Sequence, residues 1–188
     1  MQIKVAKSAG FCFGVKRAVG IAESYVEKGI PAVTLGEIIH NPTVVESLRR
    51  RGVLPIRNIE ECPKGSTVIL RSHGVPLSVI EKLEEKGIPY EDATCPFVAR
   101  IHKIVAERTA AGDEVILIGN PDHAEVKGII GHAKGKVHVV RNLNELEELV
   151  ENEKTFCAKC HTLLSQTTLL RAEWEKCEKF AKRVYTNL

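Results

Sequence analysis

Residues 114–119 read Glu-Val-Ile-Leu-Ile-Gly, and this stretch decides the class of fold. Its apolar, β-branched run ends on glycine and is the strongest strand signal in the chain. The flanking segments Pro96–Ala111 and Glu125–His132 have the periodicity of amphipathic helices. A strand between two such helices predicts a parallel sheet with crossover helices.

The same alternation of strands and helices extends over the rest of the chain. We expect strands at Ile3–Ala6, Ala32–Leu35, Thr67–Leu70, near Tyr90 and at Val137–Val140, and helices at Gly14–Lys28, Pro42–Arg51, Pro76–Lys86, Leu143–Val150 and Leu169–Lys182. Residues 154–165 fit neither pattern. The prediction is therefore an α/β protein of two similar small units with mainly parallel sheets, one over residues 1–94 and one over 95–188.

Composition narrows the classes of function. The chain has 188 residues, 44% of them hydrophobic, and a net charge of +3, which is too small to indicate a nucleic-acid partner. The first ten residues hold no apolar stretch of signal-peptide length, and no 18 uncharged apolar residues run together. We therefore expect a cytoplasmic protein that neither binds nucleic acid nor enters a membrane. Its six cysteines are expected to stay reduced, as core residues, nucleophiles or metal ligands.

Reactive side chains recur in the turns that precede helices. In open parallel sheets, ligands bind beyond the carboxyl ends of the strands, where these turns lie. Six residues fall in such turns: Cys12, His40, His73, Cys95, His123 and Thr167. Their common placement predicts a binding site at this edge of the architecture.

Cys12 and Cys95 each stand directly before a predicted helix, and Cys12 lies between Gly10 and Gly14. Glycines let the backbone approach a bulky group, and a helix N-terminus favours the thiolate that binds metal. A buried apolar cysteine is the alternative for each position. Two thiols about 80 residues apart lack the paired spacing of a zinc site, but they suit a cluster held between separate units.

The histidines at these turns suggest an anion site. Imidazoles beside helix N-termini combine N–H donors with the positive ends of helix dipoles, so a phosphate group is the expected ligand of His40, His73 and His123. Glu125 could deliver a proton at the same turn, or it could merely complement the helix dipole. Thr167 could cap the last helix or face the pocket. We interpret three further histidines as structural or surface residues: His102, His132 and His138.

Six ordered motifs resemble the 4-hydroxy-3-methylbut-2-enyl diphosphate reductase family. They are Gly-Phe-Cys-Phe-Gly-Val at 10–15, Ile-Ile-His-Asn at 38–41, Arg-Ser-His-Gly-Val at 71–75, Asp-Ala-Thr-Cys-Pro at 92–96, His-Ala-Glu-Val at 123–126 and Gln-Thr-Thr-Leu at 166–169. The resemblance implies an oxidoreductase of the non-mevalonate isoprenoid pathway. It also implies three similar α/β domains around a [4Fe–4S] cluster that three cysteines hold.

Carried over residue by residue, the resemblance assigns roles to the turn residues. Cys12 and Cys95 would ligate the cluster. The histidines at 40, 73 and 123 would bind the substrate's diphosphate and its hydroxyl network. Glu125 would supply a proton and Thr167 would orient that relay. The implied reaction is a reductive removal of a hydroxyl that gives isopentenyl and dimethylallyl diphosphate, with electrons from ferredoxin or flavodoxin.

Two features depart from the family pattern. The third cluster ligand lies in the family's third domain, and this chain ends at Leu188, about where that domain should begin, so we expect the domain to be absent. Residues 156–161 read Phe-Cys-Ala-Lys-Cys-His where the family has a plain strand. Two alternatives follow, namely a non-catalytic metal-binding or redox module that uses Cys157 and Cys160, and an inactive remnant of the reductase.

Overall fold

The structure is a computed structural model that describes residues 3–6, 9–152 and 161–185. The chain divides into two compact units, one of Met1–Ser72 with Gly87–Cys95 and one of His73–Lys86 with Pro96–Leu188. The predicted domain boundary at 94/95 stays a prediction. The compact units differ from it because residues 73–86 group with the second unit.

Unit 1 is built on a four-stranded parallel sheet in the order β2-β1-β3-β4. Its strands are β1 (Ala32–Leu35), β2 (Leu54–Ile56), β3 (Thr67–Leu70) and β4 (Tyr90–Asp92), and its helices are α1 (Phe13–Glu27), α2 (Pro42–Arg50) and the 3-10 turn η1 (Ile59–Glu61). The buried face of α1 carries Ala18 and Ala22, whose small side chains let the helix lie close to Ile69 of the sheet. Asn41 caps α2 by accepting a hydrogen bond from the Val44 amide at 3.2 Å.

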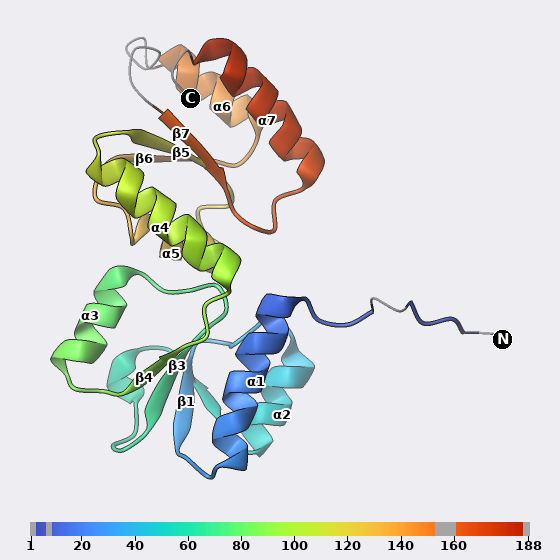
Figure 1. Ribbon diagram of the computed structural model, residues 1–188, viewed down its shortest axis with the longest axis vertical. Coiled ribbons are helices and arrows are strands. Elements are labelled where there is room, and N and C mark those ends of the chain that lie inside the picture. The colour runs from blue at the N-terminus through green and yellow to red at the C-terminus, as the bar shows by residue number, and fades with distance from the viewer. Residues whose placement is uncertain (1–2, 7–8, 153–160, 186–188) are drawn as a thin grey trace. The chain divides into compact units, whose positions relative to one another are not determined.

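Unit 2 contains a three-stranded parallel sheet in the order β6-β5-β7. Its strands are β5 (Glu114–Ile118), β6 (Val137–Val140) and β7 (His161–Ser165), and its helices are α3 (Leu77–Glu85), α4 (Pro96–Ala110), α5 (Ala124–Ile130), α6 (Leu143–Asn152) and α7 (Arg171–Val184). Figure 1 shows α4 and α5 on one face of this sheet and α6 and α7 on the other. All five residues of β5 are buried, because both faces of this central strand are covered.

The predicted α/β class with parallel sheets is confirmed, and three of the predicted strands have the observed bounds. Two elements of unit 1, β2 and η1, were not predicted. Pro55 lies inside β2, and proline weakens a strand signal because it cannot donate to the ladder. The structure places β2 at the edge of the sheet, where proline is tolerated.

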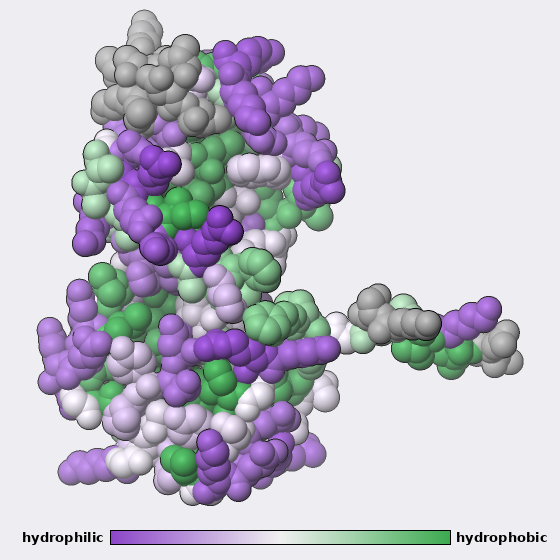
Figure 2. Space-filling view, viewed as in Figure 1, coloured by the Kyte–Doolittle hydropathy of each residue, from purple (hydrophilic) through white to green (hydrophobic). Residues whose placement is uncertain are grey.

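The predicted strand at Ile3–Ala6 is wrong. These residues have no regular secondary structure, and Ile3 and Val5 are 77% and 78% exposed. Figure 2 shows the resulting apolar surface on the N-terminal segment. The segment has the alternation of a strand, but none of the described strands pairs with it, so its apolar side chains have no sheet to join. Among the described residues, no helix has the length and apolarity needed to span a membrane.

Candidate functional site

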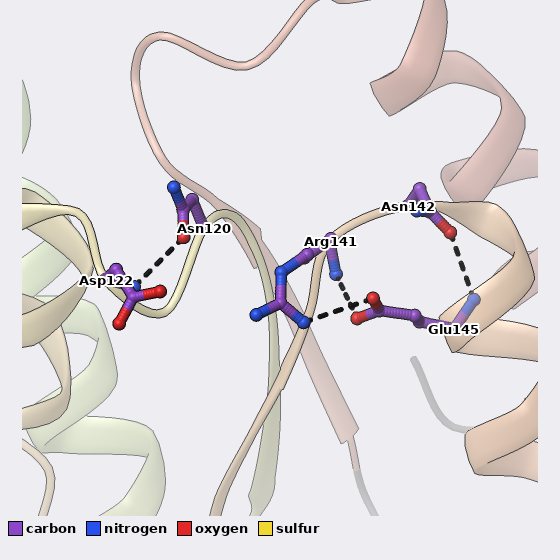
Figure 3. Close-up of polar contacts among 5 residues, drawn as sticks. All are labelled: Asn120, Asp122, Arg141, Asn142 and Glu145. Atoms are coloured by element: carbon purple, nitrogen blue, oxygen red, sulfur yellow. Dashed lines mark hydrogen bonds and ion pairs between the residues drawn. The ribbon is translucent and has the colours of Figure 1, made fainter.

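The turn after β5 delivers His123 to the beginning of α5. The side chain of Asn120 accepts a hydrogen bond from the Asp122 amide at 3.0 Å (Figure 3). The His123 amide donates to the Asn120 carbonyl at 2.9 Å. His123 is the N-cap residue of α5, and its Nδ1 accepts a hydrogen bond from the Glu125 amide at 3.2 Å. Because Nδ1 is the acceptor, the ring proton is on Nε2, which makes that nitrogen a donor.

His73 lies beside His123 in unit 2. The two ring centroids are 5.5 Å apart, and the rings meet edge to face at 87°. The pair of imidazoles lies at the beginning of α5, and the anion site there stays a prediction. His40, the third predicted member, follows β1 in unit 1 and is exposed.

Glu125 has a fully buried side chain in the first turn of α5. One carboxylate oxygen accepts a hydrogen bond from the Thr167 amide at 2.6 Å, and the other accepts one from the Thr167 hydroxyl at 2.9 Å. A buried carboxylate needs such donors, since burial without partners costs several kcal/mol. Glu125 is therefore a buried carboxylate with its own donors, and its place in the first turn of α5 also suits the helix dipole.

Thr167 does not cap the last helix, which corrects one of the two roles considered for it. The N-cap residue of α7 is Leu170, and it makes no side-chain capping bond. The Thr167 hydroxyl is instead turned toward Glu125. A threonine shortly before a helix shows only that a hydroxyl is available near the helix N-terminus. Here that hydroxyl bonds to Glu125, a residue from another part of the chain, and not to the helix backbone.

Gln166 connects the turns after β5 and β7 and was missed by sequence reasoning. Its Oε1 accepts a hydrogen bond from the Asn120 amide at 2.8 Å, and its Nε2 donates to the Thr168 hydroxyl at 2.7 Å. A Cβ added at Gly119 would lie 2.7 Å from Gln166 Oε1. The sequence offered two signals, the motif at 166–169 that contains Gln166 and the glycine after β5, but neither indicates that the two residues meet.

The turn after β6, at the same edge of the sheet, is closed by its own polar groups. Figure 3 shows Arg141 beside Glu145, whose carboxylate accepts from the Arg141 amide at 2.8 Å and from its guanidinium at 3.2 Å. Asn142 accepts from the Glu145 amide at 3.1 Å and so caps the first turn of α6. The chemistry of this edge is thus concentrated in the turns after β5 and β7.

In unit 1, Cys12 is the N-cap residue of α1 and is exposed, whereas Cys95 follows β4 and is half-buried. The Cys95 amide donates to the Ser72 carbonyl at 2.9 Å. A Cβ added at Gly14, in the first turn of α1, would overlap the Cys95 Sγ and lie 3.0 Å from its Cβ. The missing side chain at position 14 thus makes the space that the Cys95 thiol occupies.

The other cysteines within the described residues are poorer metal ligands. The Cys62 Sγ lies 3.6 Å from the Pro63 carbonyl and 3.8 Å from the Ser66 carbonyl, and burial raises the pKa of its thiol. Cys177 is fully buried on α7, and burial raises its pKa to about 11. Both environments favour the neutral thiol over the metal-binding thiolate. Cys157 and Cys160, the predicted alternative site, lie outside the described residues.

The three histidines predicted to be structural or surface residues have partners of their own within unit 2. The rings of His102 and His132 stack with centroids 4.1 Å apart, and His132 Nε2 donates to the Val75 carbonyl at 3.0 Å. His138 Nε2 lies 2.8 Å from a carboxylate oxygen of Glu114, and both side chains are 8% exposed. None of these partners is a residue of the candidate site.

Comparison with known proteins identifies the family. The sequence profile described as "LytB protein" matches residues 3–188. The chain belongs to the LytB family. Among curated relatives of this LytB chain, the protein of Caldanaerobacter subterraneus subsp. tengcongensis is 43% identical over 179 residues, which are 93% of this chain and 60% of the relative. The Aquifex aeolicus protein is 44% identical over 158 residues, which are 82% and 54%. Both relatives are named 4-hydroxy-3-methylbut-2-enyl diphosphate reductase.

Two solved structures share the fold of this LytB chain. A structure described as (E)-4-hydroxy-3-methyl-but-2-enyl diphosphate reductase, the terminal enzyme of the non-mevalonate pathway, matches with a TM-score of 0.82 at 38% identity, over 97% of this chain and 64% of that one. The Plasmodium falciparum reductase matches with a TM-score of 0.83 at 28% identity, over 95% and 57%. The chain spans about 60% of the length of the first relative named above.

Proposed function

We propose that this LytB chain serves the reductive dehydroxylation of 4-hydroxy-3-methylbut-2-enyl diphosphate to isopentenyl and dimethylallyl diphosphate. The names of its relatives support the reaction class. The observation that carries the proposal is the buried Glu125 carboxylate with two hydrogen bonds from Thr167, next to the imidazole of His123. A carboxyl group placed in this way can hold a proton at a defined atom and release it to a bound substrate.

His40, His73 and His123 bind the anionic and hydroxyl groups of the substrate in this proposal. His123 has its proton on Nε2, so that nitrogen can donate to a phosphate or hydroxyl oxygen. The edge-to-face contact between His73 and His123 fixes the direction of both rings. A diphosphate gains from such preoriented donors and from the dipole of α5.

Cys12 and Cys95 are the proposed ligands of a [4Fe–4S] cluster. The two thiols suit this role, because Cys12 is exposed at a helix N-terminus and the Cys95 thiol occupies the space that Gly14 leaves. When bound, such a cluster supplies the electrons and a Lewis-acidic iron for the substrate's hydroxyl group. Ferredoxin or flavodoxin is the proposed electron donor, and the cytoplasm is the proposed compartment.

Glu125 supplies a proton in a reaction that consumes two electrons and two protons. The carbon–oxygen bond breaks, the hydroxyl leaves as water with one proton, and the second proton joins the allylic carbon skeleton. Thr167 keeps the carboxylate in one orientation through its amide and its hydroxyl. The hydroxyl can also pass a proton between the carboxyl group and a substrate oxygen, since it both donates and accepts.

The test starts with anaerobic reconstitution of the chain with iron and sulfide. We expect about four irons with matching sulfide in the native protein, a loss of both in the Cys12→Ser and Cys95→Ser variants, and consumption of the substrate with a reduced donor. The Glu125→Gln variant should lose activity by about 10²–10⁴-fold. Glu148→Gln, an exposed change on α6, is the matched control and should remain active. A fully loaded chain that converts no substrate would overturn the proposal.

A further inference from the structure

We propose that helix α1 sets the position of the Cys95 thiol relative to Cys12, and that Gly14 and Arg17 are the positioning residues. The proposal rests on the role assigned above to the two cysteines. All of the contacts involved lie within unit 1. Neither Gly14 nor Arg17 touches the substrate or the reacting atoms, so both would act through Cys95.

Cys12 is bound to the beginning of this helix through its backbone. It is the N-cap residue of α1, and its carbonyl accepts the hydrogen bond of the Lys16 amide at 2.9 Å. The position of its Cα therefore moves with the first turn of the helix. Residues 92–95 form the loop that carries Cys95, called the Cys95 loop below. Any contact between this loop and the first turns of α1 therefore fixes the position of Cys95 relative to Cys12.

Gly14 makes the first such contact. It is buried in the first turn of α1, and an added Cβ would overlap the Cys95 Sγ and approach the Cys95 Cα to 3.7 Å. Its backbone has helical geometry, so glycine is required here for the close approach and not for an unusual φ. Gly20, in the same helix, has no heavy atom within 4 Å of an added Cβ. The two glycines of α1 thus differ in what an alanine would meet.

Arg17, one turn further along α1, makes the second contact. Its Nη1 donates to the Thr94 carbonyl at 3.1 Å and its Nη2 donates to the Asp92 carbonyl at 3.0 Å. A guanidinium has rigid, planar donors, and two bonds to carbonyls of one loop fix that loop in orientation as well as in distance. Lysine presents a single flexible charge and cannot reproduce this fork.

The Cys95 loop is in turn stiffened from within. The Asp92 carboxylate accepts hydrogen bonds from the Thr94 amide at 2.8 Å and from the Thr94 hydroxyl. The Cys95 amide donates to the Ser72 carbonyl at 2.9 Å. The loop is thereby attached to the end of β3 on one side and to α1 on the other. Cluster ligands need such support, because a site that is loose by about 1 Å loses its function.

The test that needs no cofactor is the rate at which iodoacetamide labels Cys95 in the metal-free, reduced chain, measured by peptide mass spectrometry with Cys12 as the internal reference. Arg17→Ala should raise the Cys95 rate by about tenfold, because two charge-assisted hydrogen bonds to the loop are lost. Gly14→Ala should raise it as well, because the new methyl group displaces the thiol from the helix. The matched controls, Lys16→Ala and Gly20→Ala, are exposed on the same helix and should leave it unchanged.

Unchanged Cys95 labelling in folded Gly14→Ala and Arg17→Ala would overturn the proposal. If Gly14→Ala fails to fold, as judged by circular dichroism, the Arg17→Ala and Arg17→Lys variants decide the question alone. Iron and sulfide content after reconstitution is the second readout. Gly14→Ala and Arg17→Ala should each bind less than half of the iron and sulfide that Gly20→Ala binds. A parent chain that binds no iron while the labelling differences persist would overturn the proposed function and leave the role of α1 intact.

Discussion

Thr167 donates both its backbone amide and its hydroxyl to Glu125, one to each carboxylate oxygen, at 2.6 and 2.9 Å. The two residues are 42 positions apart and belong to the turn after β7 and the first turn of α5. Glu125 is fully buried, so these donors replace the water that the carboxylate would otherwise bind. The two hydrogen bonds therefore stabilise unit 2 and also orient the carboxylate for the proposed proton transfer.

Removal of the Thr167 hydroxyl should destabilise the protein. Thr167→Val keeps the shape and the amide donor but leaves one buried carboxylate oxygen without its hydroxyl partner, which costs about 1–3 kcal/mol of unfolding free energy. Urea denaturation measures this cost. Thr43→Val, an exposed change on α2, is the control and should alter the free energy by less than about 0.5 kcal/mol. Equal midpoints for the two variants would show that the hydroxyl contributes nothing.

Gly119 should not tolerate alanine, whereas Gly20 should benefit from it. An added Cβ at Gly119 would lie 2.7 Å from Gln166 Oε1 and 2.9 Å from a methyl group of Val126. The displacement of Gln166 would break its hydrogen bond with the Asn120 amide, so Gly119→Ala should cost about 1–3 kcal/mol. Gly20→Ala lies in open space inside a helix and should stabilise by about 0.5–1 kcal/mol. Thermal unfolding of both variants gives the comparison, and shifts of the same sign would contradict it.

The sequence predicts the alternating elements well because their signals are local. Buried strands such as 114–118 and 67–70 are short apolar runs between glycine or helix signals, and the tertiary structure agrees with them. The segment 3–6 has an equally good strand pattern and forms no strand, because a strand needs a partner that local sequence cannot supply.

The residues of the candidate site also differ in whether local sequence can indicate them. Placement before a helix indicates Cys12, Cys95 and His123 from a few neighbouring residues. The roles of Gln166 and Arg17 depend on contacts 46 to 77 residues away along the chain. Local patterns carry no information about such distant partners, and ordinary side chains of these types are mostly solvated. Only the fold reveals that they position the turns.

Cys177 should be the least reactive cysteine of those that the structure describes. It is fully buried, and burial raises the pKa of its thiol to about 11, with the nearby Glu173 as a smaller cause. We expect iodoacetamide at pH 8 to label Cys12 in the folded protein and to spare Cys177, and to label both in denaturant. Rapid labelling of Cys177 in the folded state would contradict its buried position.

The same shift makes stability depend on pH in the alkaline range. The pKa of Cys177 is higher in the folded state than the unfolded value of 9.0, so the folded state binds the proton more tightly. This contribution is fully present below pH 9 and is lost as the pH rises through about 11. Urea midpoints between pH 8 and 11 should fall more steeply for the native protein than for Cys177→Ala, which has no thiol to titrate.

The buried pair of His138 and Glu114 should show strong coupling in a double-mutant cycle. Their side chains are each 8% exposed and meet at 2.8 Å, and Lys136 approaches the same carboxylate oxygen at 3.6 Å from a more exposed position. His138→Leu would remove the hydrogen-bonding imidazole from a buried carboxylate that keeps Lys136 nearby, and should cost about 1–3 kcal/mol. Glu114→Leu combined with His138→Leu should cost clearly less than the two single changes together, because the double variant buries neither charge nor unpaired donor. Urea denaturation of the four proteins gives the coupling energy, and strictly additive costs would mean that the two side chains contribute independently.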